Sequence, residues 1–136
     1  MKSKWLVTAV LLLSTTLLLA AADGSWLKKV SPADRKRVNP YAGQSEAAAA
    51  GRNLFADNCA RCHGENATGR YNRPSLRSAR IAHATDGELA WILKNGEPWK
   101  GMPSWSSLPE QQRWQIITYL RKLQAEPISE SADATR

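Results

Sequence analysis

The amino-acid sequence predicts an all-α protein with one domain, built from three main helices joined by long loops. Three stretches combine a helix-start signal with apolar residues that recur at helical spacing. Long runs in which apolar and polar residues alternate, as in a half-buried strand, are absent from the sequence. The chain of 136 residues has room for a single hydrophobic core.

The first 22 residues have the pattern of an export signal. Lys2 and Lys4 form a basic start, residues 5–22 are mostly apolar, and the small residues that end at Ala22 suit a signal peptidase. We predict cleavage after Ala22 and a periplasmic, exported protein. The alternative is an uncleaved membrane anchor, because the apolar stretch approaches the roughly 20 residues that span a bilayer.

Residues 23–44 carry turn formers and little apolar periodicity, which predicts an extended N-terminal linker. The basic run Arg35–Arg37 gives this linker a second interpretation, as a docking strip for a partner. We place the domain at residues 45–124 and expect residues 125–136 to form a flexible polar tail.

The first main helix is expected from Ser45, as N-cap, to a point near Cys59. Gly51 in its interior costs stability relative to Ala, by about 1 kcal/mol. Because Gly51 lies on the same face as Phe55, we expect another helix to approach closely at Gly51.

The other two main helices each follow a capping-box pattern, in which a Ser or Thr is followed three residues later by Glu. Thr85 and Glu88 open the second helix, which ends at Gly96. Ser107 and Glu110 open the third helix in the same way. The apolar stripe of this third helix consists of Trp114, Ile116, Ile117, Leu120 and Leu123.

The five residues Cys59-Ala60-Arg61-Cys62-His63 contain both cysteines of the chain at C-x-x-C-H spacing. Two thiols at this spacing suit covalent attachment to one haem, and the following His63 suits ligation of its iron. A zinc site is disfavoured because His83 is the only other histidine, which leaves the set one ligand short of four. A dithiol redox pair would need a preceding buried strand, and a disulfide across three residues would constrain little. The motif therefore predicts one haem c, which would also order the long loops at 64–84 and 97–106.

Met102 is the expected second axial ligand of the haem iron, because it is the only methionine after the initiator. It lies between Gly101 and Pro103, in a loop where the backbone can approach the haem closely and is stiff. Imidazole and thioether together are a ligand pair of electron-transfer haem proteins. Two alternatives remain open: His83 as the ligand, and Met102 as a filler of the core.

Residues 45–124 resemble class I c-type cytochromes, and more narrowly the small periplasmic monohaem cytochromes of bacteria. The resemblance rests on the C-x-x-C-H motif after the first helix, on Met102 in a late loop, and on a closing helix with an aromatic residue. It implies a cytochrome c fold and electron transfer. The helix-contact residues of the family fall here at Gly51, Phe55, Tyr119 and Leu120.

The resemblance also implies roles around the haem. A Pro carbonyl after the motif supports the proximal histidine in this family, and Pro74 matches it, although an ordinary turn proline explains it too. Trp99 is expected either to close the haem crevice or to pack in the core. Apart from the resemblance, guanidinium groups suit the haem propionates, with solvated surface residues as the alternative; the four candidates are Arg70, Arg73, Arg77 and Arg80.

The sequence thus predicts an electron carrier rather than an enzyme. The net charge is +7, and +5 without Lys2 and Lys4 of the signal, which favours redox partners with acidic docking surfaces. Nucleic acid is not an expected partner, since no dense basic cluster occurs, and the membrane is one only if the signal is retained. We expect a monomer or a subunit of a redox complex; the alternatives are a haem subunit of a dehydrogenase or reductase, and a gas sensor or peroxidase with a labile sixth ligand.

Overall fold

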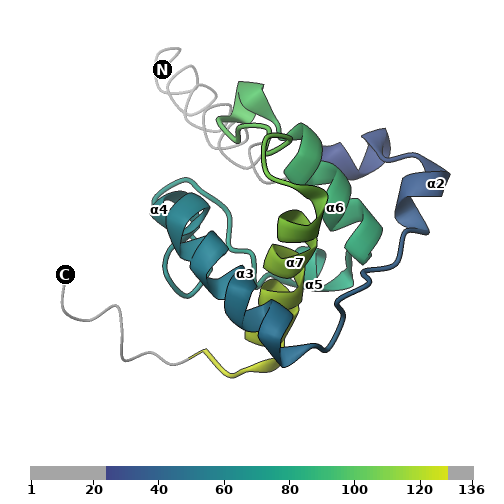
Figure 1. The fold of residues 1–136 in the computed structure, drawn as a ribbon. Coiled ribbons are helices and arrows are strands. Elements are labelled where there is room, and N and C mark those ends of the chain that lie inside the picture. Colours follow the sequence, from purple (N-terminus) through teal and green to yellow (C-terminus); the bar gives the residue numbers. More distant parts are fainter. Residues whose placement is uncertain (1–23, 129–136) are drawn as a thin grey trace, which may run out of the picture.

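The computed structural model describes residues 24–128, and within this range it contains six α-helices, two 3-10 turns and no strand. Figure 1 shows α3 and α7 crossing at the centre of the fold, with α6 beside α7. The all-α prediction is confirmed. The predicted signal at residues 1–22 and most of the predicted tail lie outside the described range. The elements in chain order are η2 (Ser25–Lys29), α2 (Pro32–Arg35), α3 (Ser45–Asn58), α4 (Ala60–His63), α5 (Ala79–His83), α6 (Asp86–Asn95), η3 (Pro98–Lys100) and α7 (Glu110–Ala125).

The crossing of α3 and α7 depends on Gly51. A Cβ atom at this position would overlap the backbone carbonyl of Gln115 and lie 3.0 Å from Cβ of Tyr119. One turn later, the ring of Phe55 is fully buried and lies 5.5 Å from the ring of Tyr119, centroid to centroid. The expected close approach of a second helix at Gly51 is confirmed.

Helix α6 begins as the sequence predicts. The hydroxyl of Thr85 accepts a hydrogen bond from the Glu88 amide, and the Glu88 carboxylate accepts one from the Thr85 amide. Gly96 ends the helix with a φ of +64°, a conformation that favours glycine.

The capping predictions for the other two helices are wrong. The N-cap of α7 is Pro109 and that of α3 is Gln44, and neither makes a side-chain cap hydrogen bond. The Glu110 carboxylate, which a capping box would turn back toward Ser107, instead accepts a hydrogen bond from the indole of Trp114 at 3.1 Å. It also pairs with Arg37.

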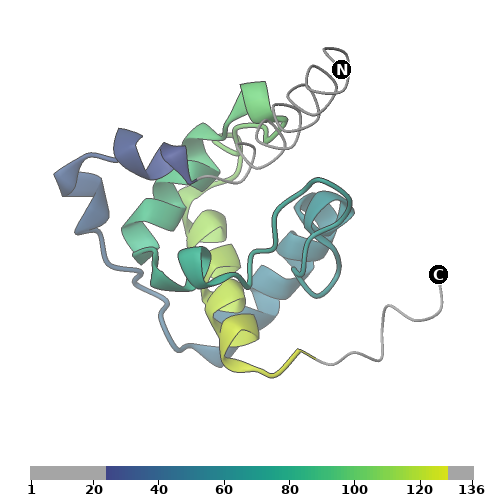
Figure 2. The same ribbon diagram turned by 180° about the vertical axis from the view of Figure 1, so that it is seen from behind.

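The prediction of an extended linker is wrong for residues 25–35, which fold into η2 and α2 and pack against α6. Figure 2 shows these two elements on the outer side of α6. Trp26 and Val30, four residues apart, are both buried, and this pair was too short to register as a helical period. A Cβ at Gly87 of α6 would overlap the carbonyl of Asp34. Two arginines of the basic run at 35–37 form ion pairs within the fold: Arg35 pairs with Glu88, and Arg37 pairs with Glu110.

The loop between α4 and α6 carries the short helix α5, which the sequence did not predict. Its apolar content is too small to mark a helical face. Among the residues that the structure describes, no helix is long and apolar enough to cross a membrane.

Candidate functional site

A cavity of about 810 Å³ lies between the helices, within the ~300–1,000 Å³ range of small-molecule and cofactor sites. Helices α3, α4, α6 and α7 and the loops after α4 and α6 contribute to its wall. Apolar side chains from all three main helices form much of this wall, among them Phe55, Leu89, Ile92, Leu93, Ile116 and Leu120.

Cys59, Cys62 and His63 all line this cavity. The chain turns helically through them, because the His63 amide donates to the Cys59 carbonyl at 2.9 Å. Residues three and four apart share a helical face, so the two sulfurs and the imidazole are presented to one side. No disulfide joins the two cysteines, and burial, reinforced by the neighbouring Cys62, raises the pKa of the Cys59 thiol to about 12.

A hydrogen bond to the backbone fixes the orientation of the His63 ring. Nδ1 of His63 lies 2.9 Å from the carbonyl oxygen of Pro74. A carbonyl only accepts, so the proton of the ring sits on Nδ1, and Nε2 keeps the lone pair that binds a metal. Burial lowers the pKa of His63, and the charge of Arg73 lowers it further, while the bond to Pro74 acts in the opposite direction. Burial and the charge of Arg73 therefore favour the neutral imidazole, which is the form that ligates a metal.

Met102 lines the same cavity and is partly buried. Its amide donates to the carbonyl of Glu97 at 3.2 Å, and its carbonyl accepts from the Glu97 amide at 2.9 Å. His83, the rival ligand, is exposed in α5 and is not part of the cavity wall.

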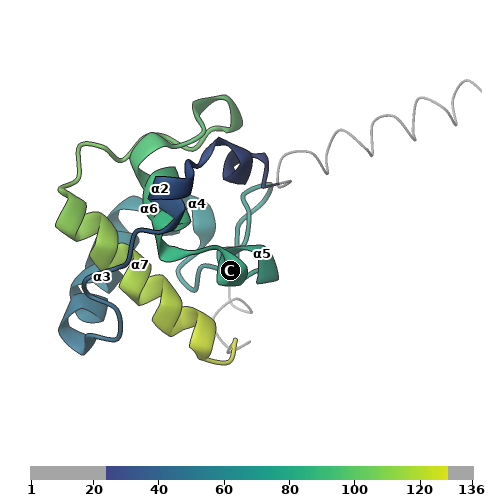
Figure 3. The ribbon, with the colours of Figure 1, turned by 90° about the vertical axis from the view of Figure 1, so that its right-hand side faces the viewer.

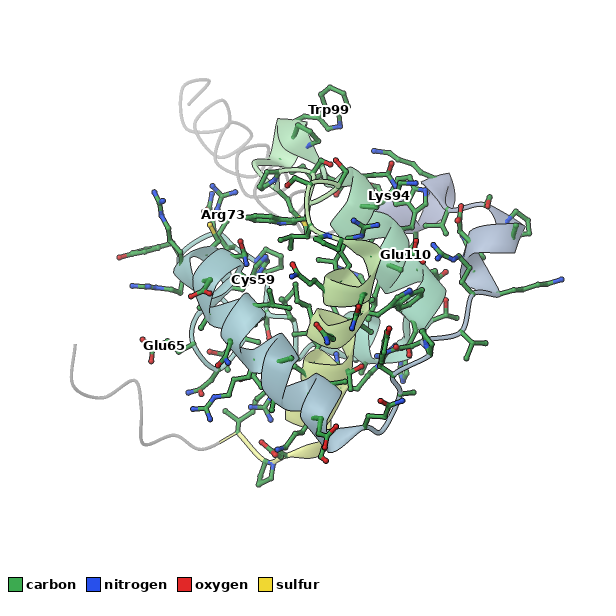
Figure 4. The ribbon with its side chains drawn as sticks, viewed as in Figure 1. Cys59, Glu65, Arg73, Lys94, Trp99 and Glu110 are labelled. Carbon is green, nitrogen blue, oxygen red and sulfur yellow. The ribbon has the colours of Figure 1, made fainter. Side chains whose placement is uncertain are left out.

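Arg73 connects two loops: the loop that carries Pro74, the partner of His63, and the loop that carries Met102. Its guanidinium donates to the carbonyl of Lys100 at 3.0 Å, and it belongs to the cavity wall. Figure 4 shows Arg73 and Cys59 on the same side of the molecule. Of the four predicted propionate partners, Arg73 and Arg80 line the cavity, whereas Arg70 and Arg77 do not.

Trp99 touches the cavity but is 84% exposed, so the expectation that it packs in the core is wrong. Figure 4 shows its ring projecting away from the helices. The reason is its place in the short turn η3, which has no face turned to the core. The sequence reasoning missed Trp26, which is buried and lines the cavity from the N-terminal side. The four-residue spacing between Trp26 and Val30 was the one signal in the sequence that could have predicted the burial of Trp26.

The residues present fit a haem better than a bare metal ion. Across residues 24–128, no three His, Cys, Asp or Glu side chains gather closely enough to hold an ion. The cavity instead offers two thiols, an oriented imidazole, a thioether and an apolar wall. Guanidinium groups such as that of Arg73 suit the carboxylates of a haem.

Comparison with known proteins identifies the family of the chain. No curated protein matches the chain. The family described as "Cytochrome C oxidase, cbb3-type, subunit III" matches residues 46–120, which is more than half of the chain and includes the C-x-x-C-H motif and Met102. The chain therefore belongs to this family and is a haem-binding, electron-transferring c-type cytochrome domain with the all-α cytochrome c fold.

Proposed function

We propose that this chain is an exported monohaem electron carrier. One haem is bound covalently through Cys59 and Cys62, and its iron is ligated by His63 and Met102. The observation that supports this most strongly is the convergence of these four side chains on one apolar cavity, with Nδ1 of His63 already engaged by Pro74.

When bound, a haem supplies a reversible one-electron couple. The protein contributes the rest. His63 and Met102 would hold the iron through imidazole and thioether, which would leave no ligand position for a substrate. The thioether would raise the reduction potential, and the apolar wall would limit access of water to the iron.

Redox proteins with acidic docking surfaces are the proposed partners. Arg73, Trp99 and Lys100 all belong to the wall of the cavity, and Trp99 is exposed there. An exposed tryptophan in the same wall as the Arg73 guanidinium suits a short-lived interface, since aromatic residues and Arg carry much of the energy of such contacts.

Covalent attachment is tested by the double variant Cys59→Ala with Cys62→Ala. The parent protein, purified from its exported fraction, should carry one haem that survives a denaturing gel, and the double variant should carry none. Intact mass should also show the loss of residues 1–22. Haem stain persisting on the double variant would refute thioether attachment.

A second candidate function is a haem subunit of a terminal oxidase complex, and the description of the matched family favours it. The two functions predict different behaviour during purification, because only a subunit stays bound to an oxidase. A subunit with a C-terminal tag should retain oxygen consumption in the purified fraction, whereas a free carrier should purify without it. Deleting residues 24–44 is not a clean test, because this segment packs against α6.

A further inference from the structure

The N-terminal strap, defined as residues 24–35, lies against the helix and the loop that present Met102. Figure 3 shows it crossing in front of α6. Trp26 of the strap is 6% exposed and forms part of the cavity wall, as does Gly24. The strap is therefore a structural part of the cavity that Met102 lines.

Polar contacts join the strap to the Met102 loop, defined as residues 96–105. Nζ of Lys29 lies 3.2 Å from one carboxylate oxygen of Glu97, and Nζ of Lys100 lies 3.5 Å from the other. Lys100 also donates to the hydroxyl of Ser25 at 2.8 Å. Glu97 itself is 6% exposed, and a carboxylate buried to this extent needs charged partners to remain stable.

Glu97 also holds Met102 through its backbone. The two residues exchange both amide-to-carbonyl hydrogen bonds, at 2.9 and 3.2 Å. The far end of the loop is anchored separately, where the Trp105 amide donates to the Leu93 carbonyl at 2.9 Å. The near end, which includes Met102, is thus tied to the strap through the side chain of Glu97 and, beside it, through Lys100.

We infer that the Lys29–Glu97 ion pair is a latch that positions Met102 in the haem pocket. The inference rests on the proposed His63/Met102 ligation. Glu97 acts as a positioning residue: its carboxylate binds the strap and its backbone binds Met102. Opening the latch removes one of the contacts that hold the near end of the loop, while the Lys100–Ser25 and Arg73–Lys100 hydrogen bonds remain. It therefore raises the fraction of molecules in which Met102 has left its place.

Imidazole reports this fraction, because a ligand that binds only one conformation has an apparent affinity proportional to the population of that conformation. The experiment titrates the full-length, haem-loaded, oxidised protein with imidazole and follows its absorption spectrum. Glu97→Gln should tighten imidazole binding by about tenfold, and Lys29→Gln by about three- to tenfold, as expected for loss of a hydrogen bond to a charged group. The double variant should bind no more tightly than Glu97→Gln alone.

Two further variants control for charge and for fold. Lys28→Gln removes the same charge from the same turn, where Lys28 is exposed, and should leave the affinity at the parent value. Lys29→Arg keeps the ion pair, and this variant should bind imidazole with the affinity of the parent protein. In the Met102→Ala background, Glu97→Gln should have no effect, because no methionine remains to be positioned.

The outcomes separate this inference from the proposed ligation. If the parent binds imidazole as tightly as Met102→Ala does, the His63/Met102 ligation is refuted, and the latch with it. If the parent binds more weakly than Met102→Ala, but Glu97→Gln and Lys29→Gln match the parent, the ligation stands and the latch is refuted.

Discussion

At the scale of single residues, the site is defined by how its side chains are held rather than by their identity alone. Pro74 fixes the proton of His63 on Nδ1, and Arg73 ties the loop next to His63 to the loop next to Met102. The C-x-x-C-H motif and Met102 could be found from the sequence because their chemistry depends on residue type and spacing. The exposure of Trp99 could not, because an aromatic residue is compatible with both a core and a surface position.

Trp99→Ala should leave the free energy of unfolding within about 0.5 kcal/mol of the parent, because an exposed side chain loses little on truncation. The same variant should exchange electrons more slowly with an acidic redox protein. Urea unfolding and stopped-flow mixing measure the two effects. A loss of more than about 2 kcal/mol would show instead that Trp99 is a structural residue.

At the scale of elements, the main helices were predictable where two independent signals agreed. Gly51 and Phe55 marked the helix crossing, and Thr85 with Glu88 marked the start of α6. The strap and α5 were missed, because a short helical element buries only one or two apolar residues and leaves no period to read. The strap is stabilised by tertiary contacts to α6, and these contacts cannot be predicted from the residues of the strap alone.

The two capping-box patterns allow a matched comparison of unfolding free energies, because one cap is formed and the other is not. Thr85→Ala removes a formed cap and a hydrogen bond to the Arg35 carbonyl, and should cost about 1 kcal/mol in urea unfolding. Ser107→Ala removes a hydroxyl that caps no helix and should cost less than about 0.5 kcal/mol. Equal losses in the two variants would contradict the different caps of α6 and α7.

At the scale of the whole molecule, the described helices surround the cavity of about 810 Å³, and Gly24 and Trp26 of the strap form part of its wall. The net charge, +7 for the whole sequence and +5 without Lys2 and Lys4, gives the protein a positive field. A field of this sign speeds the encounter with an acidic partner and is screened by salt.

Electron transfer with an acidic redox partner should therefore slow as ionic strength rises from about 10 to 150 mM, where the screening length falls from ~30 to ~8 Å. The second-order rate constant from stopped-flow absorbance is the measurement, with a neutral small-molecule reductant as the control. A rate that rises with salt would contradict electrostatic attraction between this protein and an acidic partner.

The most direct test of the account is carbon monoxide binding to the reduced, haem-loaded protein. If His63 and Met102 both ligate the iron, as proposed, the parent should bind no carbon monoxide at rest, and Met102→Ala should bind it readily and have a lower reduction potential. Carbon monoxide binding by the parent equal to that of Met102→Ala would contradict a closed electron-transfer site and would favour a gas sensor or peroxidase.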